Sequence, residues 1–263
     1  MLVLALTVLV GSGAAERLDA AAKALAAFER DRALTELEAA ALARPLAYDE
    51  HVRLYELLGI THAYLGHDKE TREAFDMLLA LAPGHALAYT LSPKVTFLFE
   101  EARKANEARG PTELRMTWPP GLEVTSEVPV TFEVVRDPMG LLRNGRLHYR
   151  THGAASGATA LNVALPALGT YAQVALPPQV DATEARALEI FFTAVDAAGN
   201  EVLRVGTSER PYTVPLAYEP PPPWYRTWWV WAGAGAVLAV ASGIALYLAD
   251  DPPERLPADV VFR

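Results

Sequence analysis

Residues 188–206 read LEIFFTAVDAAGNEVLRVG, and this stretch decides how the second half of the chain folds. Runs rich in aromatic and β-branched residues, which favour strands, flank the five-residue segment DAAGN at 196–200. Gly and Asn tolerate the positive φ angles that a tight turn requires. The stretch therefore predicts a β-hairpin with strands at 188–196 and 201–206.

The same signals extend over residues 111–217, where period-two runs are bounded by Gly and Pro. Further strands are expected at 113–118, 128–135, 146–151, 159–165, 170–176 and 212–216. Seven or eight short strands in one region of this size predict an all-β sandwich.

This β region resembles immunoglobulin-like or fibronectin-type-III-like modules of bacterial proteins. The resemblance lies in residues 147–150 (LHYR), in Thr170-Tyr171 and in residues 189–200. Two roles are open for Asp196 and Asn200, a calcium ligand pair and stabilisation of the turn. The second is favoured, because few other carboxylates are near in sequence.

Residues 16–110 are rich in Ala, Leu and Glu and poor in β-branched residues, a composition that favours helix. Stop and start signals are present at Gly66, at Pro83-Gly84 and at Ser92-Pro93. Asp49 is a plausible N-cap for the third helix. The sequence predicts five helices at 17–30, 32–43, 50–65, 68–81 and 93–108.

The third and fourth helices resemble a tetratricopeptide repeat (TPR), a 34-residue helix-turn-helix unit. Tyr55, Leu58-Gly59, Gly66, Phe75 and Pro83 match the family's aromatic, Leu-Gly, glycine and proline positions. Gly59 would let the two helices approach, and Phe75 would fill the space between them. The first two helices form a weaker copy, and a generic five-helix bundle is the alternative.

In such repeats the first helix of each pair lines a concave groove. The resemblance therefore implies that Arg53, Glu56, Ile60 and Tyr64, one stripe of the third helix, bind a protein or peptide partner. The alternative is that this stripe packs against the next domain.

Both ends of the chain carry apolar segments, consistent with a mean hydropathy of +0.12. Residues 1–15 read as a signal peptide that ends in small residues, although they lack an early Lys or Arg. The alternative is that residues 2–10 begin the first helix.

Residues 227–249 contain no charged residue and predict one transmembrane helix of about 34 Å, flanked by Trp and Tyr. A Pro-rich linker at 218–226 precedes it, and a short tail at 250–263 follows. Gly235, Ala239 and Gly243 share one face of this helix and would support packing into a homodimer. The alternative is that these three residues have no role in pairing and only reflect the high Gly and Ala content of membrane helices in general.

The composition excludes several classes of function. The chain has 263 residues, a net charge of −9 and no cysteine. The acidic balance argues against a nucleic-acid partner. The absence of cysteine excludes disulfides, thiol catalysis and cysteine-based zinc sites. No catalytic or metal-binding motif is present, so we expect no enzyme activity, no metal and no cofactor.

The expected fold class is therefore multidomain α plus β: TPR-like helical hairpins at 16–110, an immunoglobulin-like sandwich at 111–217 and one transmembrane helix. This order of parts resembles TPR-containing proteins of the bacterial envelope. We expect a protein-interaction scaffold or assembly factor, anchored by one helix in the inner membrane with its bulk in the periplasm. The alternatives are a single-pass sensor and, third, an envelope enzyme acting on cell wall or glycan.

Overall fold

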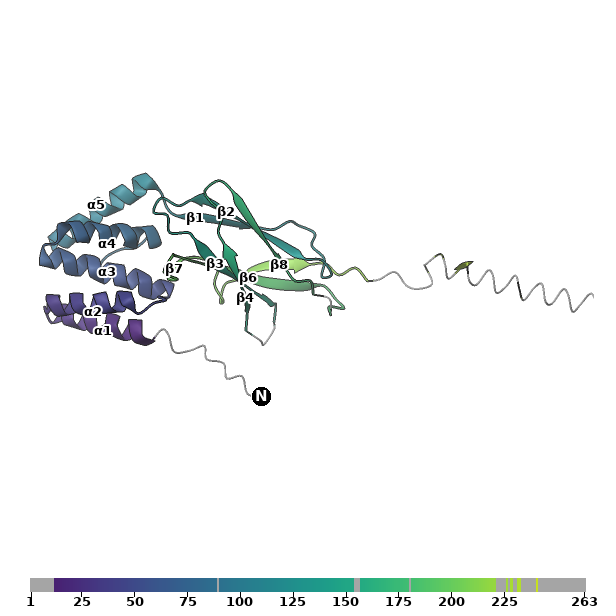
Figure 1. Cartoon of the computed structure of the whole chain (residues 1–263), viewed down its shortest axis with the longest axis horizontal. Coiled ribbons are helices and arrows are strands. Elements are labelled where there is room, and N and C mark those ends of the chain that lie inside the picture. The colour runs from purple at the N-terminus through teal and green to yellow at the C-terminus, as the bar shows by residue number, and fades with distance from the viewer. Residues whose placement is uncertain are drawn as a thin grey trace, which may run out of the picture. The chain divides into compact units, whose positions relative to one another are not determined.

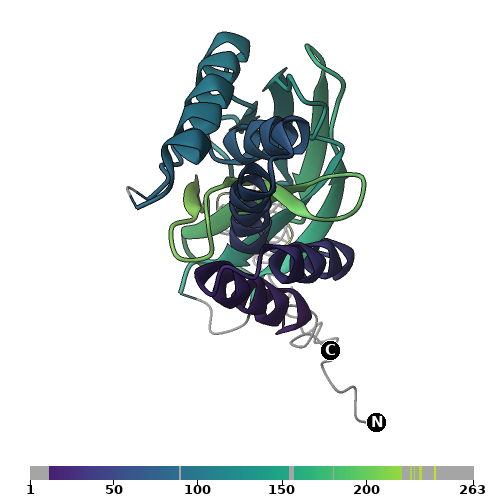
Figure 2. The same cartoon turned by 90° about the vertical axis from the view of Figure 1, so that its left-hand side faces the viewer.

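The computed structural model describes residues 12–88, 90–153, 157–179 and 181–220, together with residues 226, 228, 231, 232 and 240. Within these residues, five helices precede eight strands. The helices are α1 (Ser12–Ala26), α2 (Arg30–Leu42), α3 (Tyr48–Leu65), α4 (Asp68–Leu81) and α5 (Pro93–Arg109). Figures 1 and 2 show them following one another in chain order, each beside the next.

The predicted helices are confirmed, with shifted ends. The range of α4 agrees with the prediction, and α5 begins at Pro93 as expected. The third helix ends as predicted, with Gly66 in the left-handed region at φ +83°. Its start differs, since Ala47 rather than Asp49 is the N-cap residue. Asp49 instead forms an ion pair with Arg204 of the β region.

The close approach of α3 and α4 has the predicted cause. A Cβ atom added at Gly59 would overlap the ring of Phe75, which is fully buried. Phe75 in turn meets Phe99 of α5 edge to face, with ring centroids 5.3 Å apart. One aromatic cluster therefore joins three successive helices.

The strands form two antiparallel sheets. The first has the order β1-β2-β5, and the second β4-β3-β6-β7 with β8 also paired to β6. The bounds are β1 (Glu113–Thr117), β2 (Val128–Arg136), β3 (Asn144–Thr151), β4 (Thr159–Ala164), β5 (Tyr171–Leu176), β6 (Arg186–Val195), β7 (Glu201–Val205) and β8 (Tyr212–Leu216). All eight predicted strands are confirmed to within two residues at either end.

Strand β6, which contains the first strand of the predicted hairpin, is the centre of the second sheet. It pairs with β3 along one side, while β7 and β8 share the other side. The two sheets pack on each other through one apolar core, to which both contribute buried side chains. Phe132 of β2 and Phe192 of β6 meet there with ring centroids 4.6 Å apart. Gly145 leaves room for that contact, because a Cβ there would overlap the Phe192 ring.

The predicted turn at 196–200 is confirmed, and it also forms a hydrogen bond to the connection between α2 and α3. The Asp196 carboxylate accepts hydrogen bonds from the backbone N–H groups of Ala198 and Asn200. The Asn200 side chain donates to Asp196 at 3.0 Å and accepts from the backbone N–H of Leu46, also at 3.0 Å. The turn-stabilising role of Asp196 and Asn200 is the one the structure shows.

A second set of polar contacts joins β7 to the start of α3. Arg204 lies between two carboxylates, 2.7 Å from Glu201 and 3.0 Å from Asp49, and its guanidinium is 5.2 Å from the centre of the Tyr48 ring. Burial by itself would lower the pKa of Arg204, but the hydrogen bonds and charges of Glu201 and Asp49 raise it. Glu201 also accepts from the backbone N–H of Tyr48 at 3.1 Å.

The division of the chain into compact units falls between residues 218 and 219. The expected helical and β regions thus lie within the first unit. The predicted signal peptide falls mostly on residues outside the described part, although Ala14 lies in α1 and is fully buried.

The expected kinship with a TPR-containing envelope protein is wrong. Helices α1, α3 and α5, which would open successive repeats, begin at Ser12, Tyr48 and Pro93, at unequal intervals. The long connection between α4 and α5 breaks any common period. In the part of the chain that the structure describes, no helix has the length and apolar character to cross a membrane. The predicted span 227–249 falls almost entirely on residues outside that part, as do Gly235, Ala239 and Gly243.

Candidate functional site

The stripe predicted to bind a partner lies on α3, and its polar members already contact other helices and loops. Arg53 forms an ion pair with Asp19 of α1 at 2.7 Å. Glu56 lies 3.5 Å from Nε2 of His85, in the connection between α4 and α5. Ile60 is buried in the core of the helical layer. The fourth member, Tyr64, is half-buried at the end of the helix.

The chain's own α4–α5 connection accounts for part of this coverage. Leu87 and Leu91 pack against the same core cluster that contains Ile60. The side chain of His85 lies beside Glu56, although its Nε2 makes no hydrogen bond. No packing was predicted for this connection, yet its two leucines, Leu87 and Leu91, were a signal that it packs on the helices.

An open hollow remains at the Tyr64 end of the stripe. It has a volume of about 330 Å³. It is lined by residues of α1, the α1–α2 turn, α2, α3 and the end of the α4–α5 connection, namely Leu25, Phe28, Arg30, Tyr64, Thr90, Leu91 and Ser92. Of the four predicted residues, the structure places only Tyr64 in this hollow, which we call the Tyr64 pocket. Leu25, Phe28 and Arg30 were not singled out from the sequence.

Phe28 is the unusual residue of the Tyr64 pocket. Its backbone is left-handed, at φ +61°, which is rare for a bulky residue. The backbone N–H of Phe28 bonds to the carbonyl of Leu25, and that of Glu29 bonds to the carbonyl of Ala24. These two bonds are those of a Schellman helix end, where the position of Phe28 is most often a glycine. Phe28 is nevertheless 80 % exposed.

The cation of the pocket is Arg30. Its guanidinium lies 5.4 Å from the centre of the Tyr64 ring and donates to the Tyr64 carbonyl at 3.4 Å. The arginine is exposed, and none of the carboxylates in the described part of the chain forms an ion pair with it. The Tyr64 pocket therefore offers two aromatic rings, aliphatic side chains and one cation with free donors.

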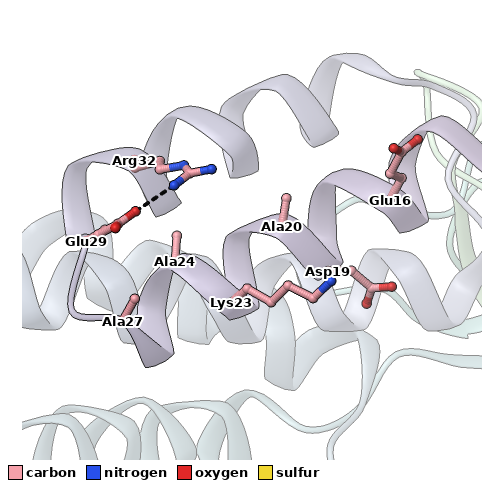
Figure 3. Close-up of a pocket in the computed structure, with 8 residues that line it drawn as sticks. All are labelled: Glu16, Asp19, Ala20, Lys23, Ala24, Ala27, Glu29 and Arg32. Carbon is pink, nitrogen blue, oxygen red and sulfur yellow. Dashed lines mark hydrogen bonds and ion pairs between the residues drawn. The ribbon is translucent and has the colours of Figure 1, made fainter.

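A larger hollow of about 670 Å³ lies between α1 and α2, and its residues are drawn in Figure 3. It exists because Ala20 and Ala24 of α1, and Ala27 just after it, present small side chains. Its charged rim includes Glu29 and Arg32, which pair with each other at 2.8 Å (Figure 3). The hollow lacks large apolar side chains, so it offers a partner little surface to bury.

Two other clusters contain groups that could do chemistry. Glu189 of β6 accepts from Arg150 at 2.5 Å and lies 2.7 Å from Nδ1 of His152. The Arg150 hydrogen bond, followed by that of His152, lowers the pKa of Glu189. His62 and His67 meet at the α3–α4 turn, with their Nδ1 atoms 3.3 Å apart. Burial lowers the pKa of His62, and the charge of His67 adds to this.

Neither of these two clusters contains a third side chain that could bind a metal ion. Over the described ranges, no three His, Cys, Asp or Glu side chains are grouped as a metal ion would need. The first cluster is a buried carboxylate bonded to both of its partners, and the second is a pair of histidines in contact. The Tyr64 pocket is thus the candidate functional site, and its chemistry is that of binding.

Comparison with known proteins adds no relative. No family model matches the sequence, and no curated protein matches it. The TPR identification therefore lacks support from sequence comparison as well as from helix spacing.

Proposed function

We propose that the chain is a non-catalytic protein-interaction scaffold that binds a partner segment in the Tyr64 pocket. The observation that carries this proposal is Phe28. A residue in the left-handed region costs about 1–2 kcal/mol relative to glycine's ready access to it, and an exposed ring adds no core packing. Such an outlier points to a role outside folding.

The pocket's composition indicates the chemistry of the partner. The rings of Phe28 and Tyr64 and the side chains of Leu25 and Leu91 fit an apolar or aromatic residue. Arg30 fits a carboxylate elsewhere on the same partner segment. We therefore propose a short partner segment that combines one large apolar residue with Asp or Glu.

Two parts of the expected setting belong to the same proposal. The two packed antiparallel sheets support an immunoglobulin-like or fibronectin-type-III-like sandwich as the rigid support of the helices. The uncharged stretch 227–249 supports an anchor in the inner membrane, with the bulk of the chain in the periplasm. Binding in the Tyr64 pocket does not depend on that location.

The test is selection of short peptides from a display library on the full chain, with the variants Phe28→Gly and Leu42→Ala. Leu42 is also 80 % exposed but does not line the pocket, so it is the matched control. We expect the selected peptides to share an apolar residue and a carboxylate. Phe28→Gly should weaken their binding about tenfold or more, as for an aromatic hot spot, and Leu42→Ala should not.

Phe28→Gly also separates binding from folding. Because glycine prefers the left-handed conformation, the variant should keep its free energy of unfolding or gain up to about 1 kcal/mol, measured by urea denaturation. Equal peptide affinity for the wild type and Phe28→Gly would show that the Tyr64 pocket is not the binding site. A large loss of stability in Phe28→Gly would mean that the ring serves the fold.

A further inference from the structure

Within the β region, one long stretch of sequence carries no charge. Between residues 153 and 180 there is no Asp, Glu, Lys, Arg or His, although charged residues make up 21 % of the whole sequence. This stretch contains β4, with the sequence TALNVA, and β5, with the sequence YAQVAL. The two strands are consecutive in the chain but belong to different sheets.

Among the strands that the structure describes, both lie at the edge of their sheet, since β4 ends one strand order and β5 ends the other. Folded proteins usually protect such edges with charged side chains or proline. The remaining edges of this molecule follow that rule: β1 carries Glu113 and Arg115, β7 carries Glu201 and Arg204, and β8 carries Pro215. Strands β4 and β5 have no such protection within their bounds.

The core-facing side chains of β5 are less buried than those of β2 beside it. In its pairing with β2, Val174 lies opposite Val130 on the face that meets the core. Val130 is fully buried, whereas Val174 is only half-buried. On the outer face, Tyr171 is 76 % exposed. A further strand beside β5 would cover Val174 and continue the hydrogen-bonded ladder.

We propose that this strand is β5 of a second copy of the chain, paired antiparallel so that the two three-stranded sheets become one. Two identical chains related by a two-fold axis place the same strand antiparallel to itself. Copies with a net charge of −9 repel each other over most of their surface, and an uncharged edge is where they can approach. This self-association goes beyond the proposed function and uses a different surface.

The alternation of faces restricts the register. Residues directly opposite each other in an antiparallel pair point to the same face, so Val174 must face a core-directed residue of the other copy. Two pairings near the middle of the strand keep this rule, one centred on Gln173 and one on Val174. The pairing centred on Val174 would put Pro177, which has no backbone N–H, opposite Tyr171. The pairing proposed is therefore the one centred on Gln173, with Ala172 opposite Val174. Gln173 is exposed and directed away from the core.

The first test places a charge on the proposed two-fold axis. The full chain is compared with Gln173→Lys and with Thr213→Lys, an exposed position on edge strand β8, by sedimentation velocity over a range of concentrations. We expect the wild type and Thr213→Lys to dimerise, and Gln173→Lys to raise the dissociation constant at least tenfold. Mixing Gln173→Lys with Gln173→Glu should restore dimers, because unlike charges then lie opposite each other.

The second test uses the absence of cysteine from the chain. Directly opposite residues of antiparallel strands have Cα atoms about 4.5–5.5 Å apart, within the range that a disulfide spans. Under mild oxidation, Gln173→Cys should form a covalent dimer and Thr213→Cys should not. A wild type that stays monomeric, or a Gln173→Lys variant that dimerises like the wild type, would overturn the proposal.

Discussion

Strands β7 and β5 both end a run of paired strands, yet the two edges are treated in opposite ways. The β7 edge meets the helices: Arg204 contacts Asp49 of α3, and the adjacent turn binds Leu46 through Asn200. The β5 edge carries no charge and leaves Val174 half-buried. At the first edge the polar side chains are fixed by partners within the chain, so the fold itself determines them. At the second edge folding places few demands on the exposed side chains, so their uniform lack of charge calls for another explanation.

The largest expected effect comes from breaking the closed edge at Asn200. This side chain is 4 % exposed and links Asp196 to the backbone of Leu46. Asn200→Ala would leave a buried N–H and a carboxylate oxygen without partners, which costs about 1–3 kcal/mol. Urea denaturation of the full chain measures this loss.

The matched control is Asn162→Ala on the open side, since Asn162 is exposed on β4. Its free energy of unfolding should change by less than about 0.5 kcal/mol. Equal losses in the two variants would contradict the distinction between a closed edge and an open one.

The second prediction concerns pH and His51, which is 3 % exposed where α3 meets β7. Its Nδ1 lies 2.9 Å from the Glu201 carbonyl, so Nδ1 carries a proton and donates to that oxygen. In the neutral ring Nε2 then carries no proton. Burial lowers the pKa of His51, against smaller opposing influences from the Glu201 backbone and Asp196. The unfolded chain, with a pKa near 6.5, then binds the proton more readily. The stability that depends on neutral His51 is therefore complete above about pH 6.5 and falls as the pH drops below it.

One group contributes at most about 1.4 kcal/mol per pH unit to this slope. Replacing His51 with Gln keeps an N–H donor for the Glu201 carbonyl but removes the titration. Urea midpoints measured between pH 7.5 and pH 5 should fall less steeply for His51→Gln than for the wild type. Parallel curves would show that His51 does not carry the pH dependence, leaving His62 and His148, whose pKa values burial also lowers.

The sequence predicted what depends on local pattern and missed what depends on distant contacts. The hairpin at 196–200, the role of Gly59 beside Phe75 and the positions of all the strands follow from residues close together in the chain. That the same turn binds Leu46 could not be predicted, because more than 150 residues separate the partners. The end of α1 was placed too late, at residue 30, because Phe28 occupies a position where a glycine would have announced the stop.

The candidate site shows the same division. Tyr64 was singled out from the helical stripe, whereas Phe28 and Arg30 enter the pocket through the α1–α2 turn, whose course no periodicity describes. The other stripe residues were placed on the right helix, but the α4–α5 connection that lies over Glu56 has no repeating pattern that would locate it. Loops that fold back over helices are therefore what limited the prediction.

The smallest expected effect separates the side chains of the two edges directly. Arg204 contacts Glu201, Asp49 and the Tyr48 ring, but about a third of its side chain is exposed, so solvent weakens these contacts. Arg204→Ala should lower the free energy of unfolding by about 0.5–1 kcal/mol. Gln173→Lys on β5 should change it by less than about 0.5 kcal/mol, measured at a concentration where the chain is monomeric. If Gln173→Lys proved as destabilising as Arg204→Ala in the monomer, β5 would be an edge that the fold itself specifies, and its lack of charge would no longer call for a second copy.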